Sequence, residues 1–283
     1  MKIKNCLDKL ASPSSNAFTL ASLFRDVDLI RKTQPLIHNI TNLVVMPTTA
    51  NILLALGASP LMAHAQEELA DIIQLAQALV INIGTLDKTW LASIEIAQQA
   101  ALKRNIPIVF DPVGAGASTY RTTAALNIIK RGVNVIRGNA SEIMALLDTS
   151  ITTKGVESTQ VSSNAVTSAQ SLAQQYHCIV VVSGKIDFIV GESMFVALDY
   201  GTPLLTKVVG MGCSLTAMIA CFLAVNPDRF NACVHAMAWM GLVSEVAEKK
   251  SHGPGSFYNE LLDSFYAVQK KDLQPLLKTD ITV

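Results

Sequence analysis

The sequence is short of charge, and the charge it has is balanced. Only 16% of its 283 residues are charged, and Lys+Arg and Asp+Glu number 22 each. A chain without excess positive charge lacks the electrostatic surface that nucleic acids and anionic membranes attract, so we expect neither partner. The first residues contain no apolar signal core, and the largely apolar run 215–225 is too short to span a bilayer. We therefore expect a soluble protein.

Cysteine pairs and the commonest nucleotide-binding motifs are also missing. The five cysteines are odd in number and form no C-x-x-C pair, which is typical of a reducing compartment, so we expect a cytoplasmic protein. No G-x-x-x-x-G-K-[ST] occurs, and neither Gly-x-Gly run, 114–116 or 210–212, extends to G-x-G-x-x-G. A P-loop ATPase and a standard dinucleotide-binding dehydrogenase are both disfavoured.

Half of the residues are hydrophobic, and their arrangement predicts an α/β fold. Short continuous apolar runs, such as 78–83 and 178–182, alternate with longer segments of helical periodicity. This alternation is typical of a central, mostly parallel sheet covered by helices on both faces. We expect 188–196 to add an antiparallel hairpin. Residues 19–283 are interpreted as a single domain that follows a poorly ordered leader, residues 1–18.

The segment 206–218 predicts a strand, a glycine loop and then a buried helix. Residues 208–209 are valines that suit a strand, and Gly210 and Gly212 let the backbone approach a ligand closely. A helix that starts just after them points unpaired N–H groups and its positive dipole end into the loop, which favours phosphate. At this position we expect the pKa of the Cys213 thiol to be lowered. A tight turn into a core helix with a buried cysteine explains the same residues.

Polar residues follow several of the predicted strands. Ligands of parallel sheets bind beyond the carboxyl ends of the strands, so these residues are expected to share one edge. Asp111 and Glu142 could hold Mg²⁺ through water, and Arg137 could neutralise phosphate charge. The glycine loop could receive a transferred group. Together these features indicate phosphoryl transfer.

Seven motifs, in order, give the chain a resemblance to the hydroxyethylthiazole kinase family from about residue 33 to residue 257. They are I-H-N-I-T-N at 37–42, T-A-N-I-L-L-A-L-G-A-S-P-L-M at 49–62, N-I-G-T-L at 82–86, D-P-V-G-A-G at 111–116, R-G-N-A-S-E-I at 137–143, K-V-V-G-M-G-C at 207–213 and G-P-G-S-F at 253–257. The resemblance implies a ribokinase-like fold. It also implies ATP-dependent phosphorylation of the primary alcohol of 4-methyl-5-(2-hydroxyethyl)thiazole, a reaction of thiamine salvage.

The resemblance further implies roles for individual residues. The implied assignments are Met62 and Asn42 at the thiazole, Gly210 on the substrate side, Arg137 and Ser183 on ATP, and Asp111 and Glu142 around Mg²⁺. Cys213 stands where ribokinase relatives carry an Asp base. A thiol is much more acidic than an alcohol, so we expect Cys213 to contribute modestly beside the backbone of Gly210 and Gly212. Family members are homotrimers with sites at subunit contacts, and we expect the same here.

Two alternatives stay open. The chain could be another ribokinase-like kinase of small alcohols, of the hydroxymethylpyrimidine or pyridoxal type, although the cysteine in place of Asp and the G-A-S-P-x-M run count against this. It could instead be a catalytically silent ligand-binding protein on the same fold, although Asp111, Arg137 and Glu142 are all retained. Pro47 and Lys185 depart from the family pattern, and Lys185 could alter the nucleotide side.

Overall fold

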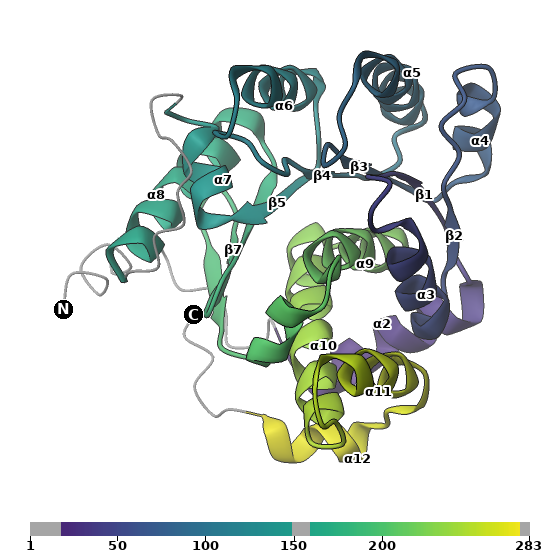
Figure 1. Cartoon of the computed structure of the whole chain (residues 1–283), viewed down its shortest axis with the longest axis vertical. Helices are drawn as coiled ribbons and strands as arrows, with labels where there is room; N and C mark the ends of the chain where they lie inside the picture. The colour runs from purple at the N-terminus through teal and green to yellow at the C-terminus, as the bar shows by residue number, and fades with distance from the viewer. Residues whose placement is uncertain (1–17, 149–158, 278–283) are drawn as a thin grey trace.

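A sheet of eight strands organises the residues that the computed structural model describes, 18–148 and 159–277 (Figure 1). The strand order is β2-β1-β3-β4-β5-β6-β7-β8. The strands are β1 Leu36–Ile40, β2 Ser59–Leu61, β3 Ala78–Asn82, β4 Ile108–Asp111, β5 Val135–Asn139, β6 Ile179–Ser183, β7 Asp187–Val190 and β8 Phe195–Leu198. All are parallel up to β6, and β7 and β8 form an antiparallel hairpin at one edge. The predicted mostly parallel sheet is confirmed. The predicted leader lies, apart from Phe18, outside the described residues.

Helices cover both faces of the sheet, and each face has its own hydrophobic core. One layer contains α2 Leu20–Thr33, α3 Met46–Leu56, α9 Met211–Val225, α10 Arg229–Glu248, α11 Pro254–Ala267 and the short α12 Lys270–Leu273. The other contains α4 Leu69–Leu75, α5 Lys88–Arg104, α6 Thr119–Arg131, α7 Ala140–Ala145 and α8 Thr159–Tyr176. Figure 1 shows these two layers on opposite sides of the curved sheet. Within the described ranges no helix is long and apolar enough to cross a membrane.

The four central strands, β3 to β6, are largely apolar and end in polar residues. Neighbouring residues of β3 face opposite cores, with Val80 in one and Ile81 in the other, so both faces of the strand are buried. At the strand ends the register pairs Asn82 of β3 with Asp111 of β4. In the same way β5 and β6 end in paired polar residues, 139 and 183. The register therefore gathers these polar side chains on one edge.

The segment before α9 differs from the prediction. Residues 208–209 form no strand; a 3₁₀ turn, η1 Pro203–Lys207, precedes them, and Val209 is 63% exposed. Valine favours a strand where a neighbouring strand is available for pairing, and here no described strand pairs with residues 208–209, although Val208 packs against the core. α9 also begins at Met211, so Gly212 and Cys213 lie in its first turn instead of in a loop. Gly210 is the N-cap, with a φ of 86°, a conformation that favours glycine.

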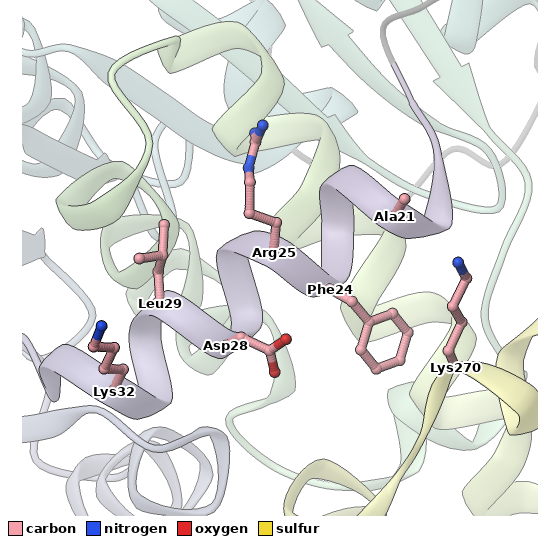
Figure 2. A pocket seen from close by; sticks show the side chains of 7 residues that line it. All are labelled: Ala21, Phe24, Arg25, Asp28, Leu29, Lys32 and Lys270. Atoms are coloured by element: carbon pink, nitrogen blue, oxygen red, sulfur yellow. The ribbon is translucent and has the colours of Figure 1, made fainter.

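The other end of α9 is anchored by a buried carboxylate of α2. Asn226, the C-cap of α9, donates to Asp26 Oδ2 at 2.6 Å, and Nδ1 of His235 in α10 lies 2.6 Å from the same oxygen. Burial raises the pKa of Asp26, but these two hydrogen bonds, together with the charges of His235 and Arg25, hold that pKa below its ordinary value. Figure 2 shows the outward side of α2, where Phe24 and Lys270 border a surface pocket. On the inward side of α2, the hydrogen bonds of Asp26 connect α2 with α9 and α10.

Candidate active site

The candidate site lies at the carboxyl edge of the sheet, where the first turn of α9 meets the ends of four strands. β3 and β4 end in Asn82 and Asp111, β5 carries Arg137 near its end, and β6 ends in Ser183. α9 packs directly against β3 and β4, so its N-terminus is held at this edge. Ligands of parallel α/β sheets bind at such an edge.

Arg137 places a guanidinium at this edge. Its Nη2 donates to Ser183 Oγ at 2.6 Å, and its Nη1 lies 3.8 Å from Asp111 Oδ2. The side chain is only 12% exposed, and its buried Nε has no hydrogen-bond partner among the described residues. A buried guanidinium N–H without a partner costs free energy unless a ligand accepts a hydrogen bond from it. The geometry therefore suits an anion, such as a phosphate group, beside Arg137.

The two glycines at the start of α9 bring the helix N-terminus onto this guanidinium. No side chain caps the N–H groups of the first turn, so they remain open to a ligand. A Cβ atom on Gly212 would lie 2.7 Å from Arg137 Nη1, and one on Gly210 would lie 3.0 Å from Cγ1 of Val45. Only glycine allows both approaches. A helix dipole and a guanidinium thus converge on one small volume, which favours bound or developing negative charge.

Asp111 is a buried carboxylate held by neighbours from two elements. It is 1% exposed, and its Oδ2 accepts hydrogen bonds from Asn82 Nδ2 at 3.0 Å and from Thr216 Oγ1 of α9 at 2.8 Å. Burial raises the pKa of Asp111 to about 6, against the opposing effect of Arg137 and with a further increase from the nearby charge of Glu142. Above that pH the carboxylate is ionised and can attract a cation.

Glu142 is fixed by backbone donors, and together with Asp111 it fits the predicted Mg²⁺ site. Its Oε1 accepts from Gly114 N at 3.0 Å, and its Oε2 accepts from Asn139 N at 2.9 Å as the capping box of α7. The described residues contain no group of three His, Cys, Asp or Glu side chains that could hold a metal alone. Mg²⁺ does not need one, because it keeps several waters and binds through one or two carboxylates and substrate phosphates.

Cys213 differs from the prediction in its acidity. The thiol is half-buried in the first turn of α9, and its Sγ accepts a hydrogen bond from Asn42 Nδ2 at 3.4 Å. Burial raises its pKa above the ordinary value, and the charge of Asp111 raises it further, against smaller opposing effects of Asn82, Asn42 and Arg137. The predicted lowering was therefore wrong. A helix N-terminus lowers a thiol pKa only where burial and a neighbouring carboxylate do not oppose it.

The structure brings most of the predicted site residues together. Hydrogen bonds, an ion pair and a close approach link Asn42, Asp111, Arg137, Ser183, Gly212 and Cys213, in part through Asn82. The charge of Glu142 acts on Asp111, and Gly210 is the N-cap of α9. Met62 is half-buried beyond the end of the edge strand β2, and β1 separates that strand from β3. This position at the edge of the sheet does not test the predicted contact with the thiazole, so the role of Met62 stays a prediction.

Two buried residues of the site received no role from the sequence. Asn82 is 1% exposed and lies at the end of a predicted strand, a position that marked it only as one of several polar strand ends. Thr216 is fully buried within α9, where its sequence context is that of an apolar helix. Both donate to Asp111: the pairing of β3 with β4 brings Asn82 to it, and the packing of α9 against the sheet brings Thr216 to it.

The chain is similar to known proteins over most of its length. The model of the hydroxyethylthiazole kinase family matches residues 27–271. A hydroxyethylthiazole kinase from Syntrophus aciditrophicus is 46% identical over 254 residues, which is 89% of this chain and 94% of the relative. The structure of a hydroxyethylthiazole kinase protein from Pyrococcus horikoshii OT3 superposes with a TM-score of 0.83 at 40% identity, covering 90% of this chain and 96% of that one.

A structure of lower sequence identity indicates the fold class. A ribokinase-like superfamily protein from Enterococcus faecalis superposes with a TM-score of 0.59 at 16% identity, covering 96% of this chain and 95% of that one. At this identity the likeness concerns the fold alone. The ribokinase-like fold predicted from the sequence is confirmed.

Gly212→Ala tests the convergence of α9 and Arg137. The new methyl group should push the guanidinium away from Ser183 and Asp111, because the Cβ position lies 2.7 Å from Nη1. We expect ATP binding in the presence of Mg²⁺ to weaken and turnover to fall roughly 100-fold, a cost typical of a misplacement of about 1 Å. Equilibrium titration measures ATP binding, and steady-state kinetics measures turnover.

Gly255→Ala is the matched control. Gly255 is also the second residue of its helix, α11, and nothing lies within 4 Å of its Cβ position. This variant should bind ATP as the unmodified protein does. Near-normal ATP binding by a folded Gly212→Ala protein would contradict the assignment of an anion site.

Proposed function

The chain belongs to the hydroxyethylthiazole kinase family, and from this premise we propose that its carboxyl-edge site transfers the γ-phosphoryl group of ATP to the primary alcohol of 4-methyl-5-(2-hydroxyethyl)thiazole. The reaction belongs to thiamine salvage. The observation that carries the proposal is the convergence of three charges on one volume: the N-terminus of α9, the guanidinium of Arg137 and the carboxylate of Asp111. Phosphoryl transfer needs positioning and charge stabilisation more than covalent chemistry, and this arrangement supplies both.

The thiazole alcohol is placed on the α9 side of the site. Its hydroxyl points at the first turn of α9, between Gly210 and Cys213, and Asn42 lies beside it. The γ-phosphoryl group approaches from the Arg137 and Ser183 side, so that negative charge develops over the open N–H groups of α9. These donors are already oriented before the reaction, which is why they stabilise the transition state without reorganising. Met62 contacts the thiazole ring in the assembled enzyme.

Asp111 and Glu142 form the acidic side of the site. Both carboxylates are held by hydrogen bonds from the protein, so their positions do not depend on a bound cation. They would hold Mg²⁺ through water. When bound, Mg²⁺ neutralises charge on the phosphate oxygens of ATP.

Cys213 assists the reaction only modestly. Its raised pKa keeps the thiol protonated at neutral pH, and a protonated thiol cannot accept a proton from the alcohol. The transition state of phosphoryl transfer is loose in most analyses, so the alcohol needs little help from a base. Cys213 contributes mainly by filling the position beside the hydroxyl, with its sulfur oriented by Asn42.

The active enzyme is a homotrimer in the cytoplasm, with sites at subunit contacts. Leu43, Val44 and Val209 are each more than 60% exposed and flank the start of α9, where Val45 packs against Gly210. Large exposed apolar side chains beside a site are typical of a surface that another subunit covers. The free, buried cysteines of the described chain, such as Cys221 and Cys233, suit a reducing compartment.

A coupled assay of ATP consumption tests the substrate. The thiazole alcohol should support turnover with Mg²⁺, and the hydroxymethylpyrimidine and pyridoxal alcohols should support much less. Identification of the phosphorylated product by mass spectrometry completes the measurement. If only the pyridoxal or the pyrimidine alcohol supports turnover, the proposed substrate is wrong. If no alcohol supports turnover, the result favours a catalytically silent ligand-binding protein.

Sedimentation velocity tests the assembly. At assay concentrations the protein should sediment as a trimer, because the apolar residues around the site are covered by a neighbouring copy. A fully active monomer under the same conditions would contradict the shared site.

Three substitutions of Cys213 test its modest role, with kcat measured at saturating ATP and thiazole alcohol. Cys213→Asp should keep or raise kcat, because a carboxylate ionised at neutral pH can accept a proton directly. Cys213→Ala and Cys213→Ser should behave alike and lose less than the roughly 10²- to 10⁴-fold typical of removing a general base. A loss beyond roughly 10⁴-fold in both folded Ala and Asp variants would show that the thiolate itself is essential.

A further inference from the structure

We propose that Asn82 is the positioning residue that couples the two halves of the site, holding the Mg²⁺–nucleotide side and the alcohol side in one geometry. The inference rests on the proposed function and assigns a role to a residue that contacts neither reacting group. Asn82 ends β3 between the two halves and is 1% exposed. Its amide makes hydrogen bonds toward both.

The orientation of the Asn82 amide is determined by its neighbours. Its Oδ1 accepts from the backbone N–H of Gly84 at 2.9 Å, and a backbone N–H can only donate. The oxygen must therefore face Gly84, and the Nδ2 must face the other way. There it donates to Asp111 Oδ2 at 3.0 Å. A flipped amide would place an N–H group against Gly84 N and an oxygen against a carboxylate.

On the nucleotide side, the hydrogen bond from Asn82 determines which carboxylate oxygen of Asp111 remains available to a ligand. The hydrogen bonds that Asp111 receives from the described residues, from Asn82 and Thr216, both reach Oδ2, and Arg137 lies closest to the same oxygen. Oδ1 is thereby left for a ligand. Partners that orient a carboxylate in this way typically change metal affinity when they are removed.

On the alcohol side, the same amide holds Asn42. Nδ2 of Asn42 donates to Asn82 Oδ1 at 2.9 Å and to Cys213 Sγ at 3.4 Å. Gly84 closes behind Asn42, because a Cβ on Gly84 would lie 2.7 Å from the Cβ of Asn42. Asn42 therefore has one position, and that position depends on Asn82.

The two halves can be perturbed separately around this residue. Among the described residues, the hydrogen bonds of Thr216 reach Asp111 and Gly212 O and not Asn42, so Thr216→Val removes a support of the nucleotide side. Asn42→Ala removes a side chain of the alcohol side and leaves the donors to Asp111 in place. Asn82 is the link between them, so its loss should weaken both sides at once.

The test uses Asn82→Ser in the full chain and two equilibrium titrations, one with ATP and Mg²⁺ and one with the thiazole alcohol. A serine hydroxyl can still accept the Gly84 N–H in a local turn, which protects the fold, but it is too short to reach Asp111. We expect both dissociation constants to rise roughly 10- to 100-fold, as for lost orienting partners at metal sites. Thr216→Val should raise only the value for ATP with Mg²⁺, and Asn42→Ala only the value for the alcohol.

Asn39→Ser is the matched control. Asn39 is equally buried in the neighbouring strand β1, but its amide donates within its own strand, at Ile37 O, and its Oδ1 has no hydrogen-bond partner among the described residues. Its two dissociation constants should stay within about twofold of the unmodified protein, a change of about 0.4 kcal/mol. Asn82→Ala serves as the second variant if the serine protein does not fold.

The outcomes separate this proposal from the proposed function. If the unmodified protein binds both ligands and the Asn82 variants weaken only one, or neither, then Asn82 does not couple the halves. An unmodified protein that binds neither ligand would overturn the proposed function and, with it, this inference. An unmodified protein that binds both but shows no turnover would contradict the proposed reaction, and the coupling would still be decided by the titrations.

Discussion

The arrangement of this site depends on one carboxylate that is almost completely buried. Asp111 has only 1% of its surface exposed, and a buried charge is tolerated only where donors and a counter-charge surround it. β3 supplies Asn82, α9 supplies Thr216, and β5 supplies Arg137. The strand order and the packing of α9 against β3 and β4 are therefore needed to keep this one group ionised. The same partners then orient it toward a ligand.

The second constraint is steric, and it acts on α9. The helix brings its N-terminus within contact of a guanidinium only because Gly210 turns with a positive φ and Gly212 carries no side chain. The benefit is electrostatic, since open N–H groups and a cation in a buried site stabilise negative charge more strongly than they would in water. Glycine in the first turn destabilises the helix, because it loses more backbone entropy on folding than other residues. The burial of the apolar remainder of α9 offsets this cost.

The character of Cys213 follows from these two features together. A helix N-terminus alone would acidify a thiol, but the burial that the site requires and the charge of Asp111 act in the opposite direction. The residue therefore sits as a thiol beside the expected alcohol. An enzyme that relies on positioning and preorganised charge can tolerate such a residue at this position, whereas one that relied on proton abstraction could not.

The sequence by itself determined the elements, the fold class and the family. Apolar runs bounded by Gly, Pro and polar residues located the strands, because burial on both faces demands such runs, and Asp111, Arg137 and Cys213 were found because they follow strands or glycines. Only the tertiary structure decided that residues 208–209 are not a strand, that α9 starts at Met211, and that the pKa of Cys213 is raised. Strand pairing, burial and the field of a neighbouring charge each depend on residues distant in sequence. For the same reason no role could be assigned from the sequence to Asn82 or Thr216, whose partner Asp111 lies 29 and 105 positions away along the chain.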